Sequence, residues 1–247
     1  VWLGEDTSNL ASFLWLHEEF VIALNSYIER FGLEELGRQR PLDPRFTEKL
    51  GVVPPGGSWY ACWEEYFTFL RRRRRHLVVR VDRTDLSKNI LRGFTAFDTF
   101  LDRHPDFRED ITFFAMLQPS RQDVPEYVEY VERITDLVSH INTKHGNTDW
   151  MPIDLRFESN LPLAITAYKY FDVMMVNSIF DGMNLVAKES MLVNERDGVL
   201  ILSENVGAFE EIGQYALAVN PFDIEAQAQA LHQALTMPHA ERRARAD

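Results

Sequence analysis

The chain has 247 residues, of which 45% are hydrophobic and 12% aromatic, enough to bury a large core. Its net charge of -12 disfavours a general nucleic-acid-binding surface, because phosphate binding needs a positive field. The single cysteine, Cys62, excludes an intramolecular disulfide, and no apolar run reaches the ~18 residues of a membrane span. We therefore expect a soluble, cytoplasmic protein without nucleic-acid or membrane partners.

The N-terminal part of the chain differs in texture from the rest. NLASFLWLHEEFVIALNSYIERF has apolar positions at helical spacing, and LDPRFTEKLGVVPPGGSW is rich in proline and glycine. These patterns predict a helical extension and linker over residues 1–75. The run Arg71–Arg75 has two readings, a patch for nucleic acid or an acidic partner and a solvated helix end, and the acidity of the rest favours the second.

From residue 76 onward, short apolar runs alternate with longer amphipathic segments. HLVVRVD, TFFAML, VMMV and VLIL predict strands, and residues 86–103 and 124–143 predict helices. Strands that are apolar on both faces are typical of a parallel sheet covered by helices. The expected fold class is α/β, a Rossmann-like parallel sheet with helices on both faces over residues 76–247.

VDRTDLSKN, residues 81–89, ends the first predicted strand. In open α/β sheets ligands bind beyond the carboxyl ends of the strands, which places Arg83 and Lys88 at the mouth of a site, on one rim with Asp181. An arginine fork and an ammonium near a helix start suit a diphosphate. A helix cap with ordinary surface charges explains the same string equally well.

DGMNLVAKE, residues 181–189, follows the apolar run VMMV. Gly182 lets the backbone approach a ligand closely, Asp181 would lie by sugar hydroxyls, and Glu189 suits the two hydroxyls of a ribose. Anionic oxygens would be received by the free N–H groups of the helix start, Met183, Asn184 and Leu185.

A plain structural reading of the same string stays open. In that reading Asp181 caps a helix, Gly182 turns the chain, and Leu185 and Val186 belong to the core. The chemistry of the residues alone does not separate the two readings.

Five strings in order resemble the C-terminal half of the trehalose-6-phosphate synthases, namely VDRTDLSKN, LQPSRQDVPEY, DGMNLVAKE, VLILSENVGAFEEIG and VNPFDIEAQAQALHQALTMPHAERRAR. This family consists of retaining glycosyltransferases with two Rossmann-like domains that face a cleft, the GT-B architecture. The resemblance runs from about Leu77 to the end. It implies that residues 76–247 form the nucleotide-sugar-binding half of such an architecture.

The resemblance also implies roles for single residues. Arg83 and Lys88 would hold the donor phosphates and Asp181 would face the transferred glucose, so these three are the expected catalytic residues. Glu189 would bind the ribose. The backbone that touches sugar and diphosphate would be Gly182, Met183, Asn184, Leu185 and Val186.

The implied reaction transfers glucose from a nucleoside diphosphate glucose to glucose 6-phosphate with retention. No cofactor and no metal are expected, so arginine, lysine and backbone N–H groups would meet the charge of the leaving diphosphate. The expected partners are a nucleotide sugar, a sugar phosphate acceptor, and an oligomer or a separate acceptor domain.

The chain departs from the family at a few points. Asp85-Leu86 and Lys88-Asn89 stand where the family usually has Asp-Tyr and Lys-Gly, a change that resembles validamycin-type pseudo-glycosyltransferases. The segment before Arg71 does not resemble the acceptor domain, since it shows neither the Gly-rich loop nor the His-Asp-Tyr-His segment. The alternatives are a noncatalytic nucleotide-sugar-binding or regulatory module, or a pseudo-glycosyltransferase, lacking that domain. In either case the aromatic residues of SWYACWEEYFTF would cover the open face or recruit a partner.

Further polar residues are second-tier candidates. A phosphate would be within reach of Ser120 and Arg121, and the helix start after SENVGAF carries Glu210 and Glu211. Histidines without a second metal-type ligand at helical spacing are expected to be satisfied core or surface residues, namely His17, His104, His140 and His145.

Overall fold

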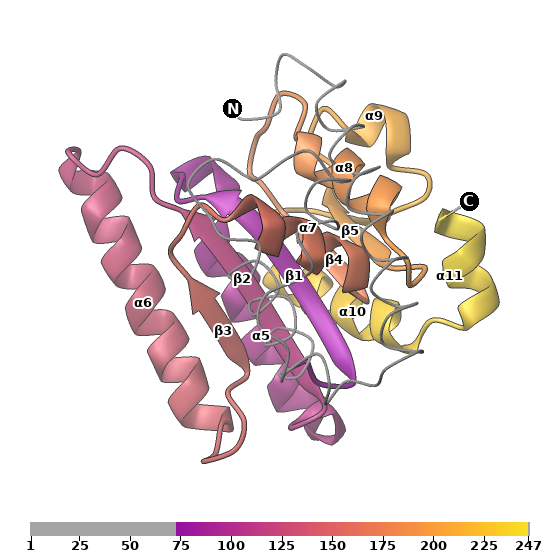
Figure 1. The fold of residues 1–247 in the computed structure, drawn as a ribbon, viewed down its shortest axis with the longest axis horizontal. Helices are drawn as coiled ribbons and strands as arrows, with labels where there is room; N and C mark the ends of the chain where they lie inside the picture. Colours follow the sequence, from indigo (N-terminus) through magenta and orange to yellow (C-terminus); the bar gives the residue numbers. More distant parts are fainter. Residues whose placement is uncertain (1–72, 247) are drawn as a thin grey trace, which may run out of the picture. The chain divides into compact units, whose positions relative to one another are not determined.

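The computed structural model describes residues 73–246 (Figure 1). The chain divides into two compact units, Val1–Trp63 and Glu64–Asp247, and every element described here belongs to the second. The strands are β1 (His76–Arg83), β2 (Ile111–Gln118), β3 (Ile153–Arg156), β4 (Val173–Val176), β5 (Val199–Ser203) and β6 (Leu217–Val219). The α-helices are α5 (Ile90–Arg103), α6 (Pro125–His145), α7 (Leu161–Tyr170), α8 (Leu185–Val193), α9 (Phe209–Ile212), α10 (Ile224–Thr236) and α11 (His239–Ala246), with 3-10 turns η1 (Leu86–Lys88) and η2 (Pro105–Phe107).

The six strands form one parallel sheet in the order β3-β2-β1-β4-β5-β6. The chain lays down β1, β2 and β3 toward one edge and then crosses back to place β4 on the other side of β1. Val78 accordingly pairs with Phe113 of β2 and with Val173 of β4. This order has its topological switch point between β1 and β4, where ligands bind in open α/β sheets.

Both faces of the sheet are buried, as the apolar strand runs predict. One core contains side chains of α5, α6 and α10 against the sheet, and a second core on the other face contains side chains of α7 and α8. In β1, Val78 joins the first core while Leu77 and Val79 join the second. The expected Rossmann-like fold with helices on both faces is confirmed (Figure 1).

At the arginine run the predicted helix end is wrong where the structure describes it, whereas Arg75 is solvated as expected, with a side chain that is 75% exposed. Residues 73–75 are not helical, and the side chain of Arg73 is only 15% exposed. Its guanidinium lies 2.7 Å from Asp172, a buried carboxylate that also accepts from the backbone N–H of Leu77 at 2.8 Å. Buried charges need such pairing. Arg71 and Arg72 lie outside the described residues.

Asp172 connects several segments at the amino ends of the strands. Besides Arg73 it pairs with Arg196 at 3.4 Å and with Arg242 of α11 at 3.6 Å. Arg242 also donates to the backbone carbonyls of Asp197 and Asp172. The carboxylate therefore ties the last helix to β4, on the side of the sheet away from the switch point.

The predicted helical extension and the SWYACWEEYFTF segment lie outside the described residues. Among the helices that the structure describes, none is long and apolar enough to cross a bilayer.

Candidate active site at the switch point

The carboxyl ends of β1 and β4 place two loops side by side. The loop after β1 carries Asp85 and Lys88, and the loop after β4 leads through Asp181 to the start of α8. The backbone N–H of Ile179 donates to the carbonyl of Ser87 at 2.8 Å, which joins the two loops directly. Residues far apart in the sequence thereby share one edge of the sheet.

Lys88 bridges the two loops with its side chain. Its Nζ lies 2.6 Å from Asp181 Oδ2 and 3.3 Å from Asp82 Oδ1. Burial acts to lower the pKa of Lys88, but the carboxylates of Asp82 and Asp181 outweigh it, so its pKa lies above the ordinary value. The ammonium is therefore permanently charged at neutral pH.

The Asp181 segment is held from the other side by the loop after β5. Asp181 and Val206 form an isolated parallel bridge, and the N–H of Gly207 donates to the Asp181 carbonyl at 3.0 Å. The backbones approach so closely that a Cβ on Gly207 would lie 1.7 Å from the Gly182 carbonyl oxygen. Only glycine fits at 207, and the close contact that it permits holds the backbone of Asp181 against the loop after β5.

Asn184, and not Asp181, caps α8. Asn184 has a left-handed backbone with φ 53°, and its side-chain oxygen accepts from the N–H of Ala187 at 3.1 Å. Its amide group donates to Asp181 Oδ2 at 3.1 Å. The plain reading of DGMNLVAKE is thus wrong about the cap, and the Asp181 carboxylate faces Lys88 and Asn184 instead.

The surface between these side chains and α8 is open. A Cβ on Gly182 would meet nothing within 4 Å, and Met183 is 57% exposed. Both precede the N-terminus of α8, whose first-turn N–H groups include those of Leu185 and Val186. Leu185 and Val186 are half-buried, and Val186 packs against the second core.

Glu189 lies one turn further along α8 and is half-buried. Burial raises the pKa of its carboxyl. Burial also raises the pKa of the Tyr168 hydroxyl, and the negative charge of Glu189 adds to that increase. The neighbouring Lys188 pairs with Glu211 at 2.6 Å, so the second-tier residue Glu211 does reach α8. Glu210 lies in the first turn of α9, and its backbone N–H donates to the carbonyl of Gly207 at 3.3 Å.

Arg83 ends β1 at the same edge but makes a separate ion pair. Its guanidinium lies 3.7 Å from Asp85, and its side chain is 42% exposed. The structure therefore brings Lys88 and Asp181 into contact, whereas Arg83 is partly exposed and pairs with Asp85 instead. The expected common rim for these three residues is confirmed by the strand order.

The departure Lys88-Asn89 has a simple backbone explanation. Asn89 has φ 58°, a left-handed conformation that glycine adopts freely and that asparagine tolerates better than other residues. Its side-chain amide donates to the carbonyls of Asn177 at 2.9 Å and Pro221 at 2.6 Å. Asparagine is thus compatible with the left-handed backbone at this position.

The loop after β2 also reaches this edge. The backbone N–H of Ser120 donates to the Thr84 hydroxyl at 2.9 Å. Arg121 donates to the hydroxyl of Tyr127 at 2.8 Å and stacks over its ring. Ser120 is therefore tied to the loop after β1, and Arg121 is tied to the first turn of α6.

Sequence reasoning missed a buried polar layer directly beneath the site. Arg80 is fully buried in β1 and donates to Asp82 Oδ2 at 3.0 Å, to the carbonyl of Lys88 at 2.9 Å, and to the side chain of Asn177. Asn177 in turn donates to Gln227 at 2.7 Å. The sequence pattern that could have indicated this layer is the pair of charged residues at 80 and 82, which share one face of an otherwise apolar strand.

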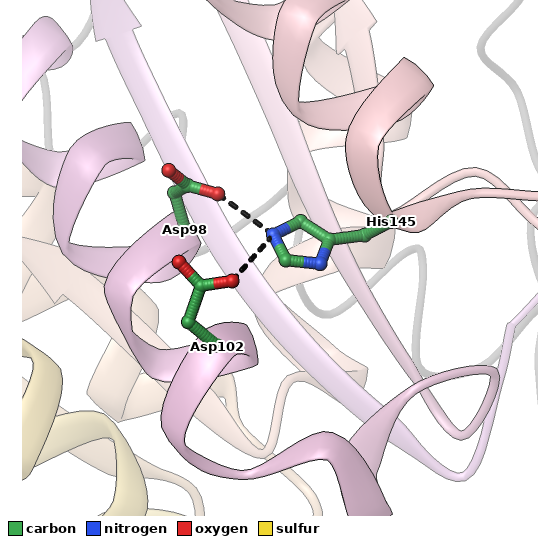
Figure 2. Close-up of side chains that lie close together, drawn as sticks. All are labelled: Asp98, Asp102 and His145. Atoms are coloured by element: carbon green, nitrogen blue, oxygen red, sulfur yellow. Dashed lines mark hydrogen bonds and ion pairs between the residues drawn. The ribbon is translucent and has the colours of Figure 1, made fainter.

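A different cluster joins α5 and α6 away from this edge. Figure 2 shows the Nε2 of His145 pointing at both Asp98 and Asp102, at 2.7 and 3.8 Å. The neighbouring ammonium of Lys144 already binds the same carboxylates at 2.9 and 2.6 Å. The arrangement therefore works as an ionic tie between two helices.

The other predicted histidines are accounted for in the same structural way. His104 stacks on His232 with ring centroids 3.9 Å apart, and His140 is exposed. His17 lies outside the described residues.

Comparison with known proteins identifies the family to which this edge belongs. Residues 64–247 match glycosyltransferase family 20. A probable alpha,alpha-trehalose-phosphate synthase (UDP-forming) 3 of Arabidopsis thaliana is 38% identical over 69% of this chain and 22% of its own length. The corresponding protein of Encephalitozoon cuniculi is 36% identical over 90% of this chain and 50% of its own length.

The Encephalitozoon match covers more of the chain than residues 73–247. Residues 73–247 make up less than three quarters of the chain, so a match to 90% of it extends into the segment before Arg73. The similarity to this relative therefore begins before Arg71, in the segment that we expected to lack the motifs of the acceptor domain.

Solved structures agree with the fold. A synthase from Burkholderia xenovorans in complex with glucose-6-phosphate has a TM-score of 0.69 at 34% identity, over 73% of this chain and 40% of that one. The trehalose-6-phosphate enzyme from E. coli bound with UDP-2-fluoro glucose has a TM-score of 0.69 at 31% identity, over 79% and 42%. The chain spans half or less of the length of each of these relatives. With the resemblance confirmed by sequence and by structure, the chain belongs to glycosyltransferase family 20.

Proposed function

We propose that residues 73–246 bind the donor of a retaining glycosyltransferase, which moves glucose from uridine diphosphate glucose to glucose 6-phosphate. The observation that carries the proposal is the contact of Lys88 with Asp181 at the switch point between β1 and β4. The names of the relatives support a uridine donor, since the synthases matched are called UDP-forming. A reducing, cytoplasmic setting suits the single cysteine.

The donor's diphosphate would lie at the N-terminus of α8. There the first-turn N–H groups carry partial positive charge, and Lys88 and Arg83 add two full charges. As the bond to glucose breaks, negative charge grows on the leaving diphosphate, and these fixed donors stabilise it. Arg83, which is 42% exposed and only loosely paired, is free to turn toward this charge.

The glucose would lie against Asp181 and the open surface at Gly182. Asp181 already accepts from Lys88 and Asn184, so sugar hydroxyls would take the place of one of these donors. Glu189, further along α8, would accept from the ribose hydroxyls. No acid/base pair is assigned to Asp181 and Glu189, because retention without an enzyme nucleophile needs none.

Paired variants of the 247-residue chain test this assignment. Asp181→Asn is expected to leave UDP binding nearly unchanged while removing the additional affinity for UDP-glucose, because the sugar is the only part of the donor that we place against Asp181. Lys88→Met is expected to weaken both ligands by about 1.5–3 kcal/mol, roughly 10- to 150-fold. Calorimetry with UDP and UDP-glucose measures the difference, and the loss at Lys88 should shrink at high salt.

The result decides between an enzyme and a binding module. Turnover of UDP-glucose with glucose 6-phosphate by the same chain supports the transferase. Binding with that pattern but without turnover supports a nucleotide-sugar-binding module that needs an acceptor partner. Equal losses for both ligands in both variants, or no binding to the parent chain, would refute the assignment.

A further inference from the structure

We infer that Arg80 and Asp82 are positioning residues for Lys88, holding its ammonium in place when the sugar of the donor draws Asp181 away. The inference rests on the proposed function and deepens it. Neither residue touches the open surface, since Arg80 is fully buried and the Asp82 side chain is only 4% exposed. Both would act through Lys88.

The starting point is the cost of burying Arg80. A guanidinium that is shielded from solvent needs a partner for each donor, because an unpaired buried charge destabilises the fold. Arg80 finds those partners in the segments that build the site: Asp82, the carbonyls of Lys88 and Ile90, and Asn177. Its contacts therefore bind the loop after β1 to the end of β4.

Space for Arg80 is reserved by a glycine in α5. A Cβ on Gly93 would lie 2.5 Å from Arg80 Nη1. Glycine inside a helix is destabilising relative to alanine. A helix glycine facing a buried arginine is thus a second sign that the guanidinium belongs at this position.

Asp82 divides its two oxygens between two cations. Oδ2 accepts from Arg80 at 3.0 Å, and Oδ1 faces Lys88 at 3.3 Å. Because Arg80 fixes one oxygen, the other cannot swing away from Lys88. In the described part of the chain, the charged groups that face the ammonium are this carboxylate from β1 and Asp181 from the loop after β4.

This division matters when the donor binds. A sugar that engages Asp181 weakens the 2.6 Å contact between Asp181 and Lys88. Asp82 then remains as the second anchor, so the ammonium keeps its charge and its position beside the diphosphate. Without Asp82, burial would favour the neutral amine once Asp181 is engaged.

The test measures the ionisation of Lys88 directly. The chain has five lysines, so lysine labelled with ¹³C at Cε gives few NMR signals, and Lys88→Arg assigns the one that matters. In Asp82→Asn the pKa of Lys88 should fall by about 1 to 3 units, the usual effect of losing a close opposite charge. Asp82→Glu should restore it.

Asp85→Asn is the matched control. Asp85 lies in the same loop and is nearly as buried, but it pairs with Arg83. The pKa of Lys88 should not change in this variant. If Asp82→Asn does not fold, the double variant Arg80→Met, Asp82→Asn removes both buried charges together and should show the same fall.

Ligand binding gives the second readout. UDP affinity of Asp82→Asn should decline at alkaline pH with the midpoint of Lys88 ionisation, and adding Lys88→Arg should abolish the decline because a guanidinium does not titrate there. An unchanged pKa of Lys88, or a UDP affinity that does not follow it, overturns the inference. A parent chain that fails to bind UDP refutes the proposed function, while the NMR titration still decides whether Asp82 positions Lys88.

Discussion

Two glycines that lie against each other in the site should respond to alanine in opposite ways. At Gly207 a Cβ would lie 1.7 Å from the Gly182 carbonyl oxygen, whereas at Gly182 it would meet nothing within 4 Å. Gly207→Ala is therefore expected to lower the stability of the fold, and Gly182→Ala is expected to weaken ligand binding. The pair separates the structural from the functional role of the same stretch of backbone.

The cost of Gly207→Ala follows from the distances. Cβ atoms essentially never lie closer than 3.0 Å to another atom, so the Cβ at 1.7 Å must force the two backbones apart. If the two backbones move apart until the Cβ lies 3.0 Å from the Gly182 carbonyl oxygen, the 3.0 Å hydrogen bond from Gly207 to Asp181 lengthens to about 4.3 Å and is broken. The lost bond and the overpacking together should destabilise the fold by about 2–4 kcal/mol.

Gly182→Ala should leave stability within about 1 kcal/mol of the parent, because the added methyl group is unopposed. It should nevertheless weaken UDP-glucose binding at least about tenfold, or about 1.4 kcal/mol, since the methyl group occupies the surface where we place the donor. Urea unfolding followed by circular dichroism measures the stability of both variants, and calorimetry measures binding.

Two outcomes would refute this reasoning. A Gly207→Ala variant as stable as the parent would mean that the close approach of the two loops is not what fixes the Asp181 segment. A Gly182→Ala variant that binds UDP-glucose as tightly as the parent would mean that the donor does not approach the backbone there.

Other predictions concern charges. Burial raises the pKa of Glu189, so its carboxyl binds a proton more tightly in the folded state than in the unfolded state. The unfolding free energy of the parent should therefore fall as pH rises above about 4.3 through the folded pKa. Glu189→Gln should remove this fall, as measured by urea unfolding at a series of pH values, and should also weaken UDP binding. Asp172→Ala should destabilise by about 3–5 kcal/mol, because Arg73 and Arg242, each only 15% exposed, lose their carboxylate and the N–H of Leu77 loses its acceptor, whereas Asp110→Asn, whose pair with Arg75 is exposed, should change stability by less than about 0.5 kcal/mol. Burial acts to raise the pKa of Asp98, but Lys144 and His145 outweigh it and lower that pKa, so Asp98→Asn should flatten the loss of stability as pH falls below about 3.9.

The main strands, and the position of the site residues at the carboxyl ends of β1 and β4, could be predicted from the sequence because each follows from a local pattern. VMMV and VLIL are apolar on both faces, and Arg83, Lys88 and Asp181 follow strand ends. The two edge strands, IDLR and LAV, were not predicted, since they are four and three residues long and carry no run that distinguishes them from loops. A strand at the sheet edge is defined by its neighbour more than by its own sequence.

Contacts between distant segments were out of reach for the same reason. Asp181 and Asn184 are both good capping residues, and only the positive φ of Asn184 decides between them. The requirement for Gly207 comes from the backbone of Gly182, which lies well before it in the chain. Arg80 carries an obvious charge, but its burial is visible only once β1 lies between β2 and β4.

The side chain of Asn89 has a consequence for motion. It fastens the loop after β1 to the backbone beyond β4 and beyond β6, so three strand-end loops share one anchor. Loops joined in this way open together or not at all, and their amide protons should exchange with solvent as one cooperative group. A site held so firmly before the ligand arrives loses little entropy on binding, which leaves any slow closing movement to segments outside this edge of the sheet.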